Sequence, residues 1–492
     1  MATPKTPTKR SKKPTSAPRA GVGTAVGQYD IWLLLIVGSL IGLGLVMVFS
    51  ASFMQSNRFF ETPTYYLLRQ LQWVAAGFVT MVVIAFTDFT ILKRLSLILM
   101  ALTVIVLLAV LIFGTDNLGS RRHLFGTSVQ PSEIAKVTII IYIAYWLSSK
   151  GNRLKAVSDG LAPFAILLGM VALLIVLQPD FDTTALIVST ALLMFFVAGA
   201  DSKQLLIILV ITTGTFVLAV TEFGYASQRV SDYVSFLQDP TAGSDQVQSA
   251  LSALSRGGVL GVGLGSGQSL VQLPFTDSIF AVIGYELGLV GTVGVILLYA
   301  AFAVRGWRIA QRSGDAFGQI LGIGITAWIT LQAFVNMGVN LAVLPYSGLT
   351  LPFISYGGSS LLACMAGVGI LLSISRYGAS HAPAPARAAV PVTRTSGTEY
   401  ATSSIRRRNW RSRLPNFGGT RSVRTGRVAS ERRTSSSRSL LGGGEFAVKA
   451  ASTARTDGLS RRVTRAKRTI ARKTSPSRRS PQSDSKRIPR RR

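Results

Sequence analysis

Cysteine is almost absent from this sequence, since Cys364 is the one cysteine among 492 residues. A single cysteine permits no internal disulfide and indicates no cysteine-based metal cluster. The sequence also has no internal repeat at a fixed period, which argues against the duplicated halves common in transporters. Acidic residues are scarce as well: 21 Asp and Glu stand against 52 Lys and Arg, for a formal charge of +31.

This positive charge is confined to the two ends of the chain. Residues 1–20 hold six Lys and Arg and no acid, and residues 377–492 hold 29 against five acids. Residues 21–376 are nearly balanced, with 17 basic and 16 acidic residues. Because the middle is strongly apolar, nucleic-acid binding is a poor description of the whole chain.

Three regions follow from this composition: a basic N-terminal tail (1–28), a polytopic membrane domain (29–376) and a basic C-terminal tail (377–492). The C-terminal tail has almost no aromatic or long aliphatic residues, so we expect it to be disordered. Its runs of arginine predict binding to anionic lipid or to an acidic cytoplasmic partner, at about 1 kcal/mol per charge near a surface. Nothing in it specifies a nucleic acid.

The apolar middle predicts an all-α integral membrane protein with about ten spanning helices. We expect the spans at 31–52, 68–87, 95–113, 132–148, 162–178, 182–199, 204–222, 279–302, 316–341 and 355–374. Most basic loop residues then fall on one side of the membrane, which the positive-inside rule makes cytoplasmic together with both tails. The first span is too long for the apolar region of a cleaved signal peptide.

The longest predicted loop, 223–277, joins the seventh and eighth spans on the extracytoplasmic side. A loop of this length is uncommon unless it is functional. The stretch SDQVQSALSALSRGG predicts a helix within it, and GGVLGVGLGSGQ (257–268) resembles a dinucleotide-binding fingerprint. No strand or βαβ unit surrounds that glycine-rich stretch, so we interpret it as a flexible turn next to a site.

Charged residues near the fourth span have two interpretations. Glu133 and Lys136 are three residues apart and share a helix face, so they can form an ion pair inside the bundle. Alternatively, Lys136 joins Arg121 and Arg122 in an outer basic patch that suits a phosphate or pyrophosphate. The spacing does not decide between them.

Four further acids lie close to the predicted spans. Asp180 and Asp182 fall in the outer link before the sixth span, where capping of a helix N-terminus explains one of them. Asp277 lies at the outer mouth of the eighth span. In a continuous helix, Glu286 would be about 13 Å deeper and on the opposite side. We therefore interpret Asp277 as reactive and Glu286 as structural, with helix capping as the alternative for Asp277.

Several motifs in residues 30–376 resemble the SEDS family (shape, elongation, division and sporulation) of integral-membrane peptidoglycan polymerases. They are GLVMVFSAS, RRHLFGTSVQPSEIAK, QPDFDTTALI, TDSIFAVIGYELGLVG and NMGVNLAVLPYSGLTLPFISYGGSSLL. The last motif resembles the cell-division branch of the family more closely than it resembles the elongation branch. The sequence departs from the usual pattern at Phe275, where His is common, and at Ser278 and Asp182.

The resemblance implies a glycosyltransferase that polymerises lipid II during septal wall synthesis, with Asp277 as the catalytic base. It implies pyrophosphate binding by Arg121, Arg122 and Lys136, with Arg229 and Arg256 as further candidates. Supporting roles fall to Glu133, Asp180, Glu286, Ser355, Gly357 and Gly358. The implied partners are a class B penicillin-binding transpeptidase and divisome membrane proteins. A divalent cation, Mg²⁺ or Mn²⁺, is reasonable with the pyrophosphate, although no metal-ligand cluster is visible. A lipid II flippase, an elongation polymerase and a scaffold remain the alternatives.

Overall fold

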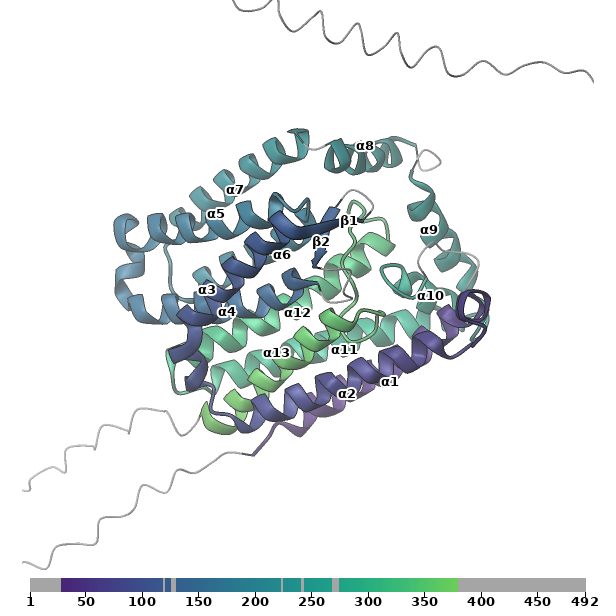
Figure 1. Ribbon diagram of the computed structural model, residues 1–492, viewed down its shortest axis with the longest axis horizontal. Coiled ribbons are helices and arrows are strands. Elements are labelled where there is room, and N and C mark those ends of the chain that lie inside the picture. Colours follow the sequence, from purple (N-terminus) through teal and green to yellow (C-terminus); the bar gives the residue numbers. More distant parts are fainter. Residues whose placement is uncertain are drawn as a thin grey trace, which may run out of the picture. The chain divides into compact units, whose positions relative to one another are not determined.

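The computed structural model describes residues 28–117, 120–124, 130–222, 224–239, 243–267 and 274–378 (Figure 1). These residues form a bundle of long helices that reverse direction at short connections. Its helices are α1 (Ile31–Phe60), α2 (Tyr65–Phe86), α3 (Thr90–Phe113), α4 (Pro131–Lys150), α5 (Ala162–Val176), α6 (Phe181–Val197), α7 (Ser202–Glu222), α11 (Gly288–Gln311), α12 (Ala316–Asn340) and α13 (Gly358–Tyr377).

Eight stretches of the described chain are long and apolar enough to cross a membrane. Helix α6, with 17 residues, is a shorter apolar helix. Helix α4 is less apolar because it carries Glu133 and Lys136. The predicted all-α membrane architecture is confirmed, and each predicted span falls on one or two of these helices.

The eighth predicted span (279–302) is wrong as a single helix. The chain forms a short helix α10 (Ile279–Glu286) and then starts α11 at Gly288. Gly288 has φ +68°, and a Cβ there would lie 2.4 Å from the backbone nitrogen of Gly261. Only glycine fits this close approach without strain. Glu286 is therefore the last residue of α10, whereas Asp277 lies in the turn before this helix, so the two residues do not share one continuous helix.

Helices α12 and α13 form the centre of the bundle. In each of them, 78% of the most apolar stretch is buried, against 12–39% in the other candidate spans. Close packing of α13 on α2 depends on small residues: a Cβ on Gly358 would lie 2.2 Å from the Trp73 ring, and one on Gly369 would lie 2.7 Å from the Met81 carbonyl oxygen. Small residues let membrane helices approach in this way.

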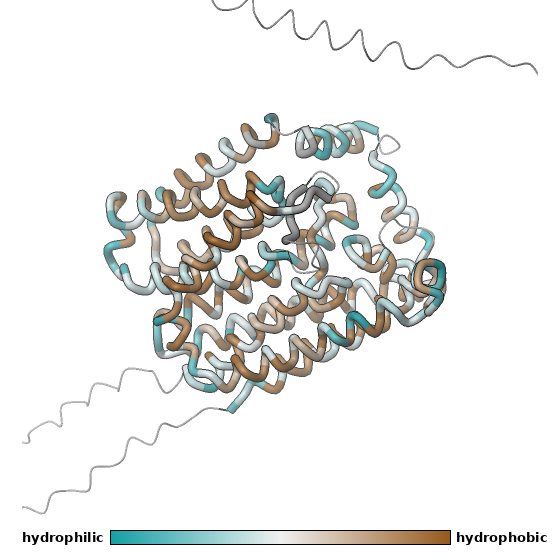
Figure 2. Tube along the Cα trace, in the orientation of Figure 1, coloured by the Kyte–Doolittle hydropathy of each residue, from teal (hydrophilic) through white to brown (hydrophobic). Residues whose placement is uncertain are grey.

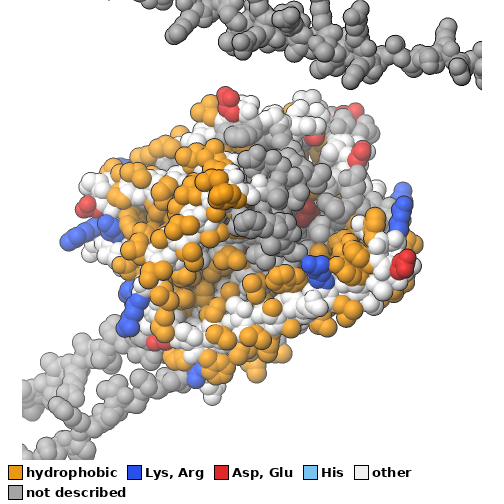
Figure 3. All heavy atoms as spheres, viewed as in Figure 1, with side chains coloured by type: hydrophobic (Ala, Val, Ile, Leu, Met, Phe, Trp, Pro, Cys, Tyr) orange, Lys and Arg blue, Asp and Glu red, His pale blue; other side chains and the backbone are white. Residues whose placement is uncertain are grey.

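The outer helices expose large apolar side chains instead. Leu35 of α1 is 56% exposed, Ile166 of α5 72% and Leu218 of α7 68%. Figures 2 and 3 show that hydrophobic residues cover most of the visible helix surface and that charged side chains gather toward its ends. A surface this apolar is typical of a protein embedded in a bilayer.

The connections contain more regular structure than expected. A hairpin of β1 (Gly114–Asn117) and β2 (Ser120–Leu124) follows α3, and a 3₁₀ turn η1 (Gly151–Lys155) and a π-helical turn η2 (Val157–Leu161) precede α5. The predicted loop 223–277 includes α8 (Gly224–Gln238) and α9 (Asp245–Gly257). Helix α9 confirms the helix predicted there, whereas α8 was not predicted. Almost all of both predicted tails lies outside the described residues.

Candidate functional site

Asp277 lies in the turn that leads into α10, at the end of the bundle where α12 ends and α13 begins. We call this the Asp277 end; the orientation predicted from the sequence places it outside. Its backbone carbonyl oxygen accepts hydrogen bonds from the side-chain amides of Asn336 at 2.8 Å and Asn340 at 3.0 Å. These amides are four residues apart on α12, so both reach the same point from one helix face.

The two residues before Asp277 are held in the same manner. The Ser355 hydroxyl donates to the Thr276 carbonyl oxygen at 2.7 Å, and the Tyr356 backbone N–H donates to the Phe275 carbonyl oxygen at 2.8 Å. Three successive carbonyl groups are thus anchored to α12 and to the segment between α12 and α13. The predicted supporting residue Ser355 therefore contacts the turn. Its hydroxyl oxygen also accepts a hydrogen bond from the Leu351 backbone N–H at 2.8 Å, which holds the hydroxyl in place.

The Asp277 carboxylate is in contact with Tyr346, from the segment between α12 and α13. The Tyr346 hydroxyl donates to Asp277 Oδ2 at 3.3 Å and accepts from Gln246 Nε2 of α9 at 3.0 Å. Burial and the nearby Asp277 carboxylate raise the pKa of Tyr346 well above its usual value. Tyr346 therefore remains a proton donor at every physiological pH.

A second carboxylate, Asp182 of α6, lies close by. Its Oδ2 accepts from Arg229 of α8 at 3.0 Å and from the Gly348 backbone N–H at 3.0 Å. The Arg229 guanidinium also lies over the Tyr346 ring, 4.9 Å from its centre. A methyl group on Gly348 would lie 3.9 Å from an oxygen of both Asp182 and Asp277. The predicted residues Asp277 and Arg229 are thus brought into one cluster.

Two hollows adjoin this cluster. A cavity of about 290 Å³ lies between α8 and α9, and a smaller one of about 10 Å³ lies over Asp277 and has room for about one water. Gln246, Val247 and Tyr346 line both of them. The Tyr346 side chain therefore stands between the larger cavity and the Asp277 carboxylate.

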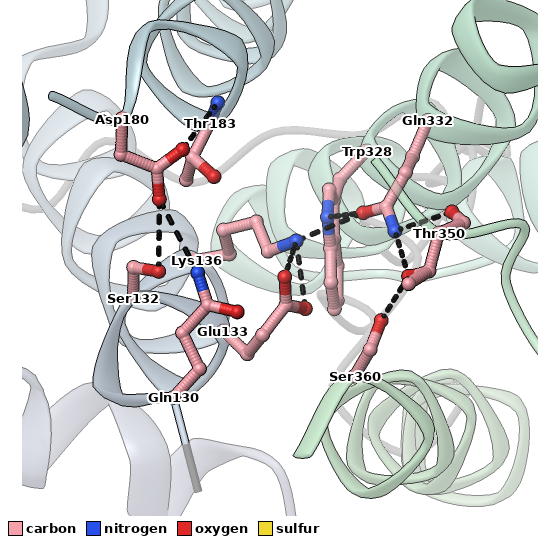
Figure 4. Close-up of polar contacts among 10 residues, drawn as sticks. All are labelled: Gln130, Ser132, Glu133, Lys136, Asp180, Thr183, Trp328, Gln332, Thr350 and Ser360. Atoms are coloured by element: carbon pink, nitrogen blue, oxygen red, sulfur yellow. Dashed lines mark hydrogen bonds and ion pairs between the residues drawn. The ribbon is translucent and has the colours of Figure 1, made fainter. Parts of the chain in front are cut away.

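Lys136 occupies a different position from the one expected for an outer basic patch. Its side chain has no exposed surface, and its Nζ lies 2.8 Å from Glu133 and 2.9 Å from the side-chain oxygen of Gln332 (Figure 4). The ring of Trp328 lies 5.5 Å from the same nitrogen. The predicted ion pair with Glu133 is present. Direct contact of Lys136 with a ligand at the surface does not fit this geometry, since the ammonium is fully enclosed by these partners.

The Lys136 network continues toward the segment between α12 and α13. Gln332 donates to the Thr350 carbonyl oxygen at 3.0 Å, and the Thr350 and Ser360 hydroxyls are 2.9 Å apart (Figure 4). The same segment carries Tyr346 and Ser355. The buried ion pair of α4 is therefore linked through side chains to the segment that holds the Asp277 turn.

The remaining predicted acids have structural positions. Asp180 caps α6, with Oδ1 accepting from the Thr183 N–H at 3.4 Å and Oδ2 from the Ser132 hydroxyl at 3.2 Å. Glu286, which is 1% exposed, accepts from the Ser50 hydroxyl at 2.6 Å. The backbone N–H groups of Gly265 and Gly267 bind its other oxygen at 3.2 and 3.0 Å.

The other predicted basic residues are not placed at Asp277. Arg256 is exposed in the last turn of α9, ten residues or about 15 Å along the helix from Gln246. Arg121 and Arg122 belong to β2, but their side chains lie outside the described residues. Of the two predicted glycines, Gly357 starts α13 with an extended backbone, and Gly358 faces Trp73 as described above.

No group of three His, Cys, Asp or Glu side chains that could hold a metal ion occurs in the described parts of the chain. Near Asp277, the second carboxylate, Asp182, is already bound to Arg229. The residues present do not fit a protein-held divalent ion, which prefers several oxygen ligands. A cation carried by the pyrophosphate of a substrate remains a proposal.

Comparison with known proteins places the chain in a family. A family model described as "Cell cycle protein", for FtsW, RodA and SpoVE, matches residues 31–380. The chain belongs to this family. The match covers the whole helical bundle, including the Asp277 turn and the segment between α12 and α13. The resemblance seen in the sequence is thereby confirmed.

Relatives within the family are similar over nearly their full length. A protein of Geobacter metallireducens named probable peptidoglycan glycosyltransferase FtsW is 36% identical over 357 residues, 71% of this chain and 95% of that protein. Stage V sporulation protein E of Bacillus subtilis is 35% identical over 355 residues, 71% of this chain and 97% of that protein.

Solved structures of the family have the same fold. One is from work on polymerization and crosslinking by a peptidoglycan synthase complex; it is 28% identical, with a TM-score of 0.60, covering 71% of this chain and 98% of that one. The rod shape determining protein RodA of Thermus thermophilus is 27% identical, with a TM-score of 0.54, covering 71% and 97%.

Several residues of the cluster were not predicted. Asn336 and Asn340 could have been found, because two amides four residues apart on an apolar helix need a polar partner. Asp182 was noted as one acid more than capping requires. Tyr346 and Gln246 carry no such signal, because their neighbours lie 69 and 100 residues away in the chain.

Proposed function

We propose that the protein is a peptidoglycan glycosyltransferase that polymerises lipid II, with Asp277 as the general base. The observation that carries the proposal is the Asp277 turn: its backbone is held by three anchored carbonyl groups, and its half-buried carboxylate lies beside a cavity. A general base needs this kind of fixed position within reach of the proton that it removes.

The chemistry follows from the carboxylate. The 4-hydroxyl of the acceptor sugar loses its proton to Asp277 as its oxygen attacks the anomeric carbon of the donor. The bond to undecaprenyl pyrophosphate breaks in the same displacement, so an α-linked donor gives a β-linked product. Tyr346, which donates to Asp277, holds the carboxylate oxygen in place before the sugar arrives.

The negative charge that develops on the pyrophosphate needs cations nearby. Arg229 is partly neutralised by Asp182, and Lys136 is enclosed in the bundle. We therefore propose that Arg121 and Arg122, in the hairpin next to α4, bind the pyrophosphate leaving group. Arg229 takes a positioning role instead, because it links Asp182 to the Tyr346 ring.

We further propose that the enzyme acts at the division septum, with a class B penicillin-binding transpeptidase as its partner. The similarity of GLTLPFISYGGSS to the cell-division branch supports this role, and so does the FtsW name of several relatives. Depletion of the protein tests it: cells should continue to elongate and fail to divide. Loss of cell width control with normal septation would instead indicate an elongation polymerase.

The decisive experiment is glycan synthesis from lipid II by the purified protein with its transpeptidase partner. Asp277→Asn preserves size and hydrogen bonding but removes basicity, so synthesis should fall by about 10²-fold or more. Glu61→Gln removes an exposed carboxylate at the same end of the bundle and should leave synthesis unchanged. Both variants should keep the melting temperature and partner binding of the parent.

Two outcomes would overturn the proposal. If Asp277→Asn polymerises within a few-fold of the parent, Asp277 is not the base. If the parent protein forms no chains but moves lipid II across vesicle membranes, the protein is a transporter.

A further inference from the structure

The cavity between α8 and α9 has no assigned role. Its volume of about 290 Å³ is at the lower limit of the roughly 300–1,000 Å³ range typical of small-molecule sites. The residues that line it include Gln228, Asp232, Tyr233, Phe236, Gln246 and Tyr346. The space suits a compact ligand unit better than a long chain.

The charge of the cavity excludes a pyrophosphate. Its one cation, among the lining residues, is Arg229, which is bound to Asp182. The lining carboxylates Asp232 and Asp245 have no hydrogen-bond or ion-pair partner in the described part of the chain. Two unpaired carboxylates beside a neutralised guanidinium repel an anion.

The lining chemistry suits a sugar. Carboxylate and amide side chains accept and donate the hydrogen bonds that sugar hydroxyl and acetamido groups need. Aromatic rings at Tyr233, Phe236 and Tyr346 offer apolar faces beside them. Asp232 is half-buried on α8, so its carboxylate is positioned to accept from a hydroxyl group in the cavity.

The cavity adjoins the small hollow that lies over the reactive carboxylate. Tyr346 and Gln246 line both the cavity and the small hollow over Asp277, and the Tyr346 hydroxyl contacts Asp277 itself. A sugar in the cavity would therefore lie one side chain away from the group that removes the proton.

We propose that the cavity between α8 and α9 is a subsite for an N-acetylated amino sugar of the glycan strand, next to the sugar that reacts at Asp277. Asp232 binds a hydroxyl group of this sugar, and Tyr346 separates it from the reacting unit. This inference rests on the proposed function, since it names a part of the same substrate.

The test is direct binding of a soluble probe to the full-length protein in detergent. The probe is a linear tetrasaccharide of N-acetylglucosamine, which carries no lipid, no peptide and no charge. Asp232→Asn should weaken its binding about tenfold, because a hydrogen bond to a charged group is replaced by one to a neutral group. Gln228→Ala, at an exposed position that tolerates truncation, should weaken it several-fold.

Glu222→Gln is the matched control, because it removes an exposed carboxylate at the end of α7 without touching the cavity; it should bind as the parent does. Unchanged affinity in both Asp232→Asn and Gln228→Ala, or no binding by the parent, would overturn the subsite.

The binding test separates this inference from the proposed function. If the parent polymerises lipid II and the tetrasaccharide binds the cavity variants as tightly as the parent, only the proposed subsite is wrong. If the tetrasaccharide binds through Asp232 but the parent makes no glycan, the proposed reaction is wrong and the sugar-binding cavity remains.

Discussion

Tyr346 is the side chain through which the parts of the candidate site meet. Its hydroxyl links Gln246 of α9 to Asp277, and its ring lies under the guanidinium of Arg229. Because a tyrosine hydroxyl can donate only while it is protonated, the contact with Asp277 depends on a high pKa at the half-buried Tyr346. Burial and the adjacent carboxylate provide it.

The raised pKa of Tyr346 predicts a pH dependence of stability. Above about pH 10 the unfolded chain loses the tyrosine proton, whereas the folded protein retains it. The free energy of unfolding should therefore be unaffected below pH 10 and decrease as the pH rises further. Tyr346→Phe should lessen this decrease, as measured by melting temperatures at pH 9, 10 and 11. The melting temperature of a control variant, Tyr377→Phe at the other end of the bundle, should fall with pH as that of the parent does. Equal declines in all three proteins would show that Tyr346 has no such role.

The Glu133–Lys136 pair is the second residue-scale feature with a measurable consequence. Removing one partner leaves the other as a buried charge, which costs about 3–5 kcal/mol. Lys136→Met should therefore lower the melting temperature more than the combined change Glu133→Gln and Lys136→Met. Thermal unfolding of the two single variants and the double variant measures the coupling. Additive losses would contradict the direct pairing seen here at 2.8 Å.

Sequence spacing could predict contacts within one helix but not between distant helices. The Glu133–Lys136 pair and the Asp180 cap were predictable, since both depend on residues three apart. The enclosure of Lys136 by Gln332 was not, because these residues are 196 positions apart and meet only through packing of α4 on α12. For the same reason, the sequence left open whether Lys136 belongs to the ion pair or to an outer basic patch.

At the scale of elements, the junction of α10 and α11 determines how the glycine-rich stretch is held. The backbone N–H groups of Val262 and Gly263 bind the carbonyl oxygens of Tyr285 and Glu286. The Glu286 carboxylate binds the N–H of Gly265 and Gly267. The stretch predicted to be a flexible turn is instead held by four hydrogen bonds to Tyr285 and Glu286.

Two glycines of this stretch provide a controlled comparison. Gly261 and Gly263 both have positive φ, +79° and +96°, so alanine at either position costs about 1–2 kcal/mol in backbone strain. Only at Gly261 would a Cβ also collide, at 2.1 Å from the Glu286 carbonyl oxygen. Gly261→Ala should therefore lower the melting temperature clearly more than Gly263→Ala. Hydrogen exchange at Gly265 and Gly267 should also accelerate only in Gly261→Ala. Similar effects of the two variants would indicate that the close approach is unimportant.

Apolar length alone could not reveal the break between α10 and α11. Residues 279–302 form an apolar run with one charged residue, Glu286, and without proline, which is typical of a single spanning helix. The break depends on the positive φ of Gly288 and on its contact with Gly261, both of which are tertiary features. Helix α8 could have been predicted, because its apolar residues at positions 230, 233, 234 and 237 follow the i, i+3, i+4, i+7 spacing of an amphipathic helix.

For the molecule as a whole, hydropathy predicted the all-α membrane architecture. The family match covers residues 31–380, close to the predicted domain 29–376. Hydropathy identifies such helices because each must satisfy its own backbone hydrogen bonds in lipid. It cannot show which helices are central, since α12 and α13 are no more apolar than α3 but are far more buried.

We predict that the C-terminal tail helps to localise the protein but is not needed for catalysis. Residues 377–492 carry an excess of 24 positive charges, 29 basic against five acidic residues, and almost all of them are outside the described residues. Deleting 380–492 should leave lipid II polymerisation by the purified core near the level of the full chain. Localisation of a fluorescent fusion to the septum should weaken. Loss of polymerase activity by a truncated core that keeps its melting temperature would contradict this separation.

The Asp277 turn is anchored through carbonyl oxygens, and this affects which substitutions the turn can accept. Every amino acid supplies a carbonyl group, so the hydrogen bonds from Asn336, Ser355 and the Tyr356 backbone do not depend on which side chains occupy the turn. The ring of Phe275 packs against the ring of Tyr66, while its carbonyl group accepts the hydrogen bond from the Tyr356 backbone. Substitution of the residues beside the acid therefore leaves these backbone anchors, and with them the position of the acid, in place.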